Sequence, residues 1–600
     1  VSYDGVPDFE LNRNVSEYIC QPGYPYCKDV IGLSLWIGSF PIGSNLSNIG
    51  PQEWQTGTPP WLATSPIQWK PLSNTSGTVD FYIESTRQSI QFSLFSNGTT
   101  YPIHLGTSNT LQFSNLHAPQ HVRIAHASAL DRSTMRVSWS ALDLDGEAEI
   151  RYGTESGNYT GSISAKPKTY DREDLCGPPA TAHGYLKAPW FYSGIVTGLQ
   201  PDRKYYYIVG SNNAMGYSRE FYFFGPKPPS ADSHLRITAF ADMGEKYIDD
   251  SEYHWIEPFS INTTSRTVHP WNTEGMTPLT LNPMILRKTK DGKQSRLAAG
   301  SGKVGKPSGK VLSAIRKHHI SYQVEHHSDV VVHVGDISYA TGYESEWDRF
   351  MTQIEPLSAH TPYMIAEGNH ERDYSGSGND IGFDDSGGEC GIPTQARFPM
   401  PTPSHTQSDI WFSWEQGPVH FVMMNTEKSL YENSSQYNFV KQDLLKIDRS
   451  ITPFVIVMGH RPFYSSSSGA TASHGWWPGL EKLLYENEVD LCLSGHVHNT
   501  ERTCPIYNQT CIIPETSDTG KYVAPIHAVI GNAGQSIAPF QRYIPPWSLF
   551  RYEGYGYSTI EVDGPGRLLT MKFWSDEEGK LLHTFTIQKK KRTEIFAFDE

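Results

Sequence analysis

Short apolar runs alternate with amphipathic stretches from about residue 235 onward. The runs are typical of buried strands, and they cover residues 237–241, 330–334, 363–366, 421–424, 454–458, 489–493 and 528–530. Amphipathic stretches between them predict helices at residues 311–324, 347–357, 436–447 and 478–487. Residues 230–600 are therefore expected to form an α/β domain with a mixed-sheet core, helices outside and a C-terminal β segment.

The first part of the chain has a different pattern, with short alternating runs between turn residues. Runs at 78–83 and 89–95 predict a small β-rich region over residues 1–112. The pattern is more regular over residues 113–229, where strands are expected at 122–124, 135–139, 148–152 and 204–209. This second segment resembles a fibronectin type III-like β-sandwich.

Polar side chains of metal-binding type follow five of the buried runs. Gly directly precedes the first of these side chains in four cases, which allows a tight turn and a close backbone approach. The residues concerned are Asp242, Asp336 with Tyr339, Asn369 with His370, His460, and His496 with His498. Because ligands bind at the carboxyl ends of strands in α/β sheets, the five motifs predict one convergent site.

The donor types indicate the class of chemistry. Two carboxylates, one amide, one phenol and three imidazoles suit iron, zinc or manganese, and the motifs contain no thiolate. Seven ligands are too many for one ion, but they suit two ions that share a carboxylate. Two ions roughly 3.5–4 Å apart commonly catalyse reactions at phosphorus.

The order of the motifs resembles that of the purple acid phosphatases, within the calcineurin-like metallophosphoesterase superfamily. The motifs are Asp-x-Gly, Gly-Asp-x-x-Tyr, Gly-Asn-His-Glu, Val-x-x-His and Gly-His-x-His. Gly244 stands where the wider superfamily usually has His, and Tyr339 supplies a phenolate instead. The resemblance covers residues 113–575 and extends to secreted fungal and high-molecular-weight plant forms.

The resemblance implies an iron(III) ion held by Asp242, Asp336, Tyr339 and His498. It implies a divalent ion, zinc, manganese or iron, held by Asp336, Asn369, His460 and His496. Asp336 would bridge the ions, and a metal-bound hydroxide would attack the phosphate. Asn369 and His370 would contact the substrate phosphate, and His370 would act as a general acid.

Two further substrate contacts are predicted, at His474 and Arg461, and Arg461 has an alternative role. His474 stands in a loop that departs from plant members in length and composition. Arg461 would clamp phosphate or make a structural ion pair. A basic insertion at residues 287–317 would hold a polyanion such as phytate, or would be an exposed loop.

The expected activity is therefore acid phosphatase activity on phosphate monoesters. A phosphodiesterase or nucleotide pyrophosphatase on the same scaffold is the alternative. A cell-surface binding protein with a decayed metal site is disfavoured, because all seven predicted ligands are present.

Composition adds an expected location. The chain has 600 residues and a formal net charge of −15, which argues against partners such as nucleic acid or anionic membranes. It has no apolar run of the roughly 18–20 residues that cross a membrane. Eight Asn-x-Ser/Thr sequons favour a secreted glycoprotein. The oligomeric state is not predicted.

The seven Cys residues fit an oxidising compartment. Cys20 with Cys27 and Cys504 with Cys511 are close enough in sequence to close small disulfide loops. Cys176 and Cys390 are candidates for a third, long-range pair. Cys492 lies in an apolar run and is expected to be a buried free thiol.

Overall fold

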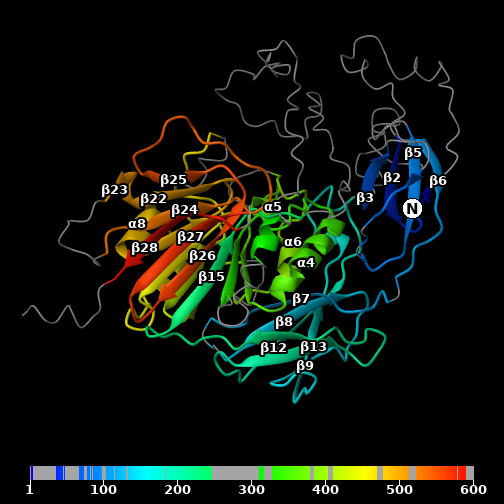
Figure 1. Ribbon diagram of the computed structural model, residues 1–600, viewed down its shortest axis with the longest axis horizontal. Coiled ribbons are helices and arrows are strands. Elements are labelled where there is room, and N and C mark those ends of the chain that lie inside the picture. The colour runs from blue at the N-terminus through cyan, green and yellow to red at the C-terminus, as the bar shows by residue number, and fades with distance from the viewer. Residues whose placement is uncertain are drawn as a thin grey trace, which may run out of the picture.

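The computed structural model divides the chain into three groups of sheets, and each sheet takes its strands from one of the three predicted ranges (Figure 1). It describes residues 2–3, 35–46, 67–96, 103–245, 310–315, 328–378, 384–402, 410–468, 477–512, 522–576 and 579–589, apart from residues 73–76 and scattered single residues. The insertion at 287–317 lies outside these ranges except for residues 310–315. His474, Cys20 and Cys27 also lie outside them.

The N-terminal region contains a four-stranded antiparallel sheet. Its order is β3 (Gln68–Leu72), β2 (Leu35–Pro41), β5 (Ile90–Ser96) and β6 (Ile103–Thr107). The strand predicted at 78–83 is wrong beyond Thr78, which ends the two-residue β4 (Gly77–Thr78). Phe81 instead packs on Phe92 without joining the sheet. The alternation of apolar and polar residues in this segment therefore reflects burial of one side of the segment, and not hydrogen bonding to a neighbouring strand.

The second group is a sandwich of two four-stranded sheets around a shared core. One sheet has the order β10 (Gly161–Ser164), β9 (Glu149–Gly153), β13 (Lys204–Gly210) and β14 (Phe221–Phe224). The other has the order β11 (Lys166–Lys168), β12 (Trp190–Val196), β8 (Met135–Ala141) and β7 (Gln120–His126). Trp139 and Tyr207 are fully buried in the core between the sheets. The four strands predicted here are confirmed.

The C-terminal group has two mixed sheets. The six-stranded sheet has the order β17 (Tyr363–Ala366), β16 (Val330–Val334), β15 (His234–Phe240), β26 (Gly556–Asp563), β27 (Leu568–Ser575) and β28 (Leu581–Gln588). The eight-stranded sheet has the order β18 (Phe412–Gln416), β19 (Val419–Met423), β20 (Phe454–Met458), β21 (Leu491–Ser494), β24 (Ile526–Ile530), β22 (Thr500–Tyr507) and β23 (Thr510–Cys511), with β25 (Ser548–Tyr552) beside β22.

Parallel strands form one half of the six-stranded sheet and the centre of the eight-stranded sheet. β15, β16 and β17 are parallel neighbours in one sheet, and β19, β20, β21 and β24 are parallel neighbours in the other. Residues of both sheets share one hydrophobic core, with Val332 and Ile456 fully buried in it. The five motifs thus follow strands of two sheets, whereas the sequence suggested one edge.

Three helices lie close to predicted positions, namely α4 (Glu344–Ser358), α7 (Ser435–Leu444) and α8 (Pro478–Glu486). Two short helices, α5 (Asn369–Arg372) and α6 (Ile392–Arg397), were not predicted. Residues 310–315 are helical within the predicted 311–324 segment. Among the described residues, no helix combines the length and apolar character needed to cross a membrane.

Two disulfides agree with the pairs predicted from sequence. Cys504 is bonded to Cys511, and Cys176 is bonded to Cys390 over a separation of 214 residues. Cys492 is a buried free thiol on β21, as predicted. The Cys176–Cys390 bond links the sandwich segment to the segment before α6.

Candidate metal centre

The predicted ligands lie on loops that follow five parallel strands. Asp242 follows β15, Asp336 and Tyr339 follow β16, and Asn369 follows β17. His460 follows β20, and the His496 and His498 pair follows β21. Although the five strands belong to two sheets, all seven side chains come together in one place.

Two overlapping groups of donors could each hold an ion. One consists of Asp336, His460 and His496, and the other of Asp242, Asp336 and His498, with the donor atoms of each group within 4.8 Å of one another. Asp336 belongs to both groups, as expected of a bridging carboxylate. All but His498, which is partly exposed, are buried.

Tyr339 lies at the centre of the second group. Its phenol oxygen is 2.9 Å from Asp242 Oδ1, 3.0 Å from Asp336 Oδ2 and 2.9 Å from His498 Nε2. A phenol has one proton and cannot satisfy two carboxylates at once. A cation among these oxygens would satisfy all of them, so the donors fit a hard metal ion.

Asn369 completes the first group. Its Oδ1 lies 3.0 Å from His460 Nε2 and 2.9 Å from His496 Nδ1. His460 Nε2 is also 3.2 Å from Asp336 Oδ1. One carboxylate, one amide oxygen and two imidazoles fit a divalent ion such as zinc or manganese.

The backbone at this site is strained. Asp242, Asp336, Tyr339 and His496 all have left-handed φ values, between 49° and 67°. Such conformations cost free energy and persist where surrounding structure enforces them, often at functional sites. The packing is tight at Gly335, where an added Cβ would lie 2.5 Å from His460 Nδ1. The imidazole of His460 therefore leaves no room for a side chain at this position.

The electrostatics of the protein groups also favour a cation at this site. Burial, together with the carboxylates of Asp242 and Asp336, raises the pKa of Tyr339 well above its usual value. A phenolate there requires added positive charge. Burial lowers the pKa of His460, but attraction to Asp336 outweighs it and raises that pKa to about 10. Binding of a metal at His460 would therefore release a proton.

Outer hydrogen bonds orient the ligands, and the sequence did not reveal them. Asp385 Oδ2 accepts from Asn369 Nδ2 at 3.0 Å, which turns the amide oxygen toward the imidazoles. His460 Nδ1 donates to the Val334 carbonyl at 3.0 Å, leaving Nε2 for the site. Ser536 Oγ lies 2.7 Å from His498 Nδ1. Such partners fix ligand orientation, but a single Asp or Ser in a loop carries no recognisable motif.

His370 lies at the rim of the site, beside the ligands. Its backbone N–H donates to Asp336 Oδ1 at 3.0 Å, and its ring packs 4.5 Å from that of Tyr339. Its Nε2 is 4.0 Å from Asp336 Oδ2, and 28% of its side chain is exposed. This placement suits a residue that meets substrate.

Arg461 makes buried ion pairs, which is the structural one of the two roles considered for it. Its Nε donates to Glu427 Oε2 at 2.8 Å, and its Nη2 donates to Asp373 Oδ2 at 3.0 Å. It is 3% exposed, and its Nη1 lies 3.1 Å from His496 Nε2. A buried guanidinium between two carboxylates favours a structural role over a phosphate clamp.

Known protein families match three parts of the chain. Residues 119–224 match the purple acid phosphatase N-terminal domain, residues 309–500 match the calcineurin-like phosphoesterases, and residues 524–582 match the iron/zinc purple acid phosphatase-like C-terminal domain. A probable inactive purple acid phosphatase of Arabidopsis thaliana, number 24, is 30% identical over 92% of this chain and 84% of that protein. The chain belongs to the purple acid phosphatase family.

Two further similarities bear on this family assignment. The structure of a purple acid phosphatase from yellow lupin (Lupinus luteus) seeds matches with a TM-score of 0.78 and 28% identity, over 94% of this chain and 92% of that one. A nucleotide pyrophosphatase/phosphodiesterase of Hordeum vulgare is 30% identical over 64% of this chain and 90% of that protein. Purple acid phosphatases use a dinuclear metal centre, and the two donor groups around Asp336 are the candidate residues for it here.

Proposed function

We propose that this protein is a metal-dependent acid phosphatase that hydrolyses phosphate monoesters. The observation that carries the proposal is the pair of donor groups sharing Asp336, with the Tyr339 phenol within 3.0 Å of both carboxylates. Asp242, Asp336, Tyr339 and His498 would hold iron(III). Asp336, Asn369, His460 and His496 would hold zinc, manganese or iron(II).

The two ions, when bound, would supply Lewis acidity and an activated water. The chain supplies the remaining functions. Asp336 holds the two donor groups together, and Asp385 fixes the amide of Asn369. His370, at the partly exposed rim, would bind the phosphate and give a proton to the leaving oxygen.

Some relatives carry names that describe those proteins as probably inactive, including the Arabidopsis relative described above. An inactive protein of this type would be expected to lack ligands or to separate them. Here all seven predicted ligands lie together, with the hydrogen-bond distances given above. This convergence supports an active centre in this chain.

A metal analysis combined with a substrate panel tests the proposal. The wild-type protein should contain iron and a second metal, and it should hydrolyse aryl phosphates at acidic pH. Asp336→Ala should lose at least one metal and nearly all activity, because it removes a donor from both groups. Full metal occupancy with near-normal turnover in Asp336→Ala would contradict the two-metal proposal.

A phosphodiesterase or nucleotide pyrophosphatase activity is the second candidate. It is favoured by the 30% identity to the barley protein of that name over 90% of its length. Rates on aryl phosphates, bis-aryl phosphates and nucleoside diphosphates would separate the two. A preference for monoesters supports the first candidate, and a preference for the other substrates supports the second. Phytate belongs in the same panel.

A secreted location is also proposed. Two disulfides lie within the described residues. The described sequon residues Asn158, Asn433 and Asn508 are all exposed. Glycosidase treatment of the protein from its native source should lower its apparent mass, and an unmodified chain would argue against secretion.

A further inference from the structure

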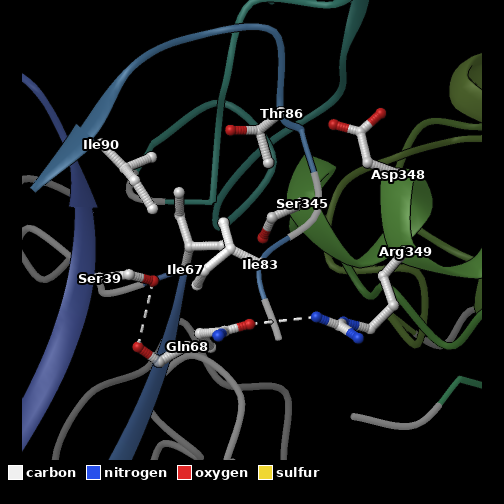
Figure 2. Close-up of a pocket in the computed structure, with 9 residues that line it drawn as sticks. All are labelled: Ser39, Ile67, Gln68, Ile83, Thr86, Ile90, Ser345, Asp348 and Arg349. Atoms are coloured by element: carbon white, nitrogen blue, oxygen red, sulfur yellow. Dashed lines mark hydrogen bonds between the residues drawn. The ribbon is translucent and has the colours of Figure 1, made fainter. Parts of the chain in front are cut away.

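Helix α4 connects the N-terminal sheet to the loop that carries the first predicted ligand, Asp242. Figure 2 shows where the N-terminal region meets α4, with Gln68, Asp348 and Arg349 around a small cavity. The family matches do not include the N-terminal sheet, because the first of them begins at residue 119.

The N-terminal region is fixed to α4 by two buried contacts. Arg87 donates to both carboxylate oxygens of Asp348, at 2.6 and 2.8 Å, and each side chain is 2% exposed. Arg349 Nη2 donates to Gln68 Oε1 at 3.1 Å, as the dashed line in Figure 2 shows. Both contacts join side chains that are more than 250 positions apart in the sequence.

The same helix holds the residues just after Asp242. Arg349 Nε lies 3.4 Å from Glu245 Oε2, with side chains 5% and 2% exposed. Gln353 Nε2 donates to the Gly244 carbonyl at 3.1 Å. Arg349 is therefore in contact with the N-terminal sheet on one side and with the 242–245 loop on the other.

The 242–245 loop in turn contacts the predicted phenolate. Gly244 N donates to the Ile337 carbonyl at 3.0 Å, and a Cβ on Gly244 would lie 3.4 Å from Tyr339 Cδ2. Asp242 and Gly244 both have left-handed φ, at 58° and 66°. Strained loops keep a metal-binding geometry only when the surrounding structure is rigid.

We propose that Arg349 and Gln353 are positioning residues for the iron side of the centre, and that the N-terminal sheet anchors Arg349 through Gln68. Their task is to hold the 242–245 loop so that Asp242 and Tyr339 face the same ion. This inference rests on the proposed function, because it concerns iron at that site.

The test compares four variants of the full-length, metal-loaded protein. Arg349→Met removes the contacts to both sides, Gln353→Leu removes the bond to Gly244 and keeps Arg349, and Gln68→Leu removes the bond between the N-terminal sheet and Arg349. The matched control is Arg87→Met with Asp348→Asn, which cuts the same interface but touches no residue of the 242–245 loop. The readouts are the visible iron–phenolate band, the rate of iron release to a chelator and the unfolding midpoint.

The three link variants should shift or weaken the visible band and speed iron release, by about 10-fold for Arg349→Met, the lower end of the effect of losing a residue that bonds directly to a metal ligand. The control should lower the unfolding midpoint and keep the wild-type band. If Arg349→Met does not fold, the result for Gln353→Leu decides, because that variant keeps the buried Arg349–Glu245 ion pair.

A wild-type band and release rate in both α4 variants would overturn the inference, whatever happens to the unfolding midpoint. An unchanged Gln68→Leu variant would overturn the part assigned to the N-terminal sheet. A wild-type protein that binds no iron would contradict the proposed function as well, so the two failures can be told apart.

Discussion

Tyr339 distinguishes this site from a zinc-only phosphoesterase at the scale of single residues. A phenolate bound to iron(III) donates charge to the metal and gives a visible absorption band, whereas zinc with its filled d shell gives none. Tyr339→Phe should abolish the band while Asp242, Asp336 and His498 retain iron more weakly. Its activity should fall less than that of Asp336→Ala, because Asp336 belongs to both donor groups.

Absorption spectra and iron content of the two variants test this assignment. A Phe variant that keeps its colour would contradict the role of Tyr339. So would a colourless wild-type protein with full iron(III) occupancy.

His370 gives a second prediction at this scale. Its side chain reaches the rim and is not part of either donor group. His370→Ala should keep both metals and lose roughly 10²–10⁴-fold in rate, the usual range for a general acid. The loss should shrink for esters with good leaving groups, which need less proton donation.

The matched control for His370→Ala is a substitution of the neighbouring metal-ligand candidate, Asn369. Asn369→Ala should lose the divalent metal, because Asn369 Oδ1 faces both His460 and His496. An equal rate loss of His370→Ala for all leaving groups would restrict His370 to phosphate binding.

At the scale of elements, the contact between β19 and α7 should respond to pH. His420 on β19 lies 2.8 Å from Asp443 on α7 and 3.3 Å from Glu415 on β18. Burial lowers the pKa of His420, but the two carboxylates outweigh it and raise that pKa above its usual value. A pKa raised on folding adds stability below the unfolded value of about 6.5, and this stability is lost as the pH rises through the folded value.

His420→Gln should therefore lower the free energy of unfolding by about 1–2 kcal/mol at pH 5, and by clearly less at pH 9. Urea unfolding at both pH values measures the difference. The control is His117→Gln, because the His117–Asp143 pair is exposed and should contribute little at either pH. A His420→Gln loss that is equal at pH 5 and pH 9 would contradict the charge-based account.

At the scale of the whole molecule, the Cys176–Cys390 disulfide joins the sandwich segment to the C-terminal group across 214 positions. A cross-link that closes a long loop removes more entropy from the unfolded chain than one that closes a short loop. Replacing both residues with Ser should lower the stability by about 2–4 kcal/mol.

The matched control is the double Ser variant of Cys504 and Cys511, which are only seven positions apart. Its loss of stability should be smaller. Chemical unfolding measures the free energy of unfolding of both variants. An equal or larger loss on removing the Cys504–Cys511 bond would show that strain or packing, rather than loop length, determines the stability that each disulfide contributes.

The parallel strands of the C-terminal group could be predicted from the sequence because they are buried on both faces. Continuous apolar runs such as 454–458 and 330–334 have no exposed face to interrupt them, and their ends are marked by Gly and polar residues. The N-terminal region was less readable. The segment at 78–83 packs its alternating apolar side chains on the sheet without pairing in it, and sequence periodicity does not distinguish these two cases.

By itself, the sequence determined which side chains are available for the metal centre and where along the chain they follow strands. Only the tertiary structure decided that these strands belong to two sheets and that Arg461 faces two carboxylates. It also decided that Asp385 orients Asn369 and that α4 connects the N-terminal sheet to Asp242. The physical reason is that a donor type is a local property of one residue, whereas its partners come from segments tens to hundreds of positions away.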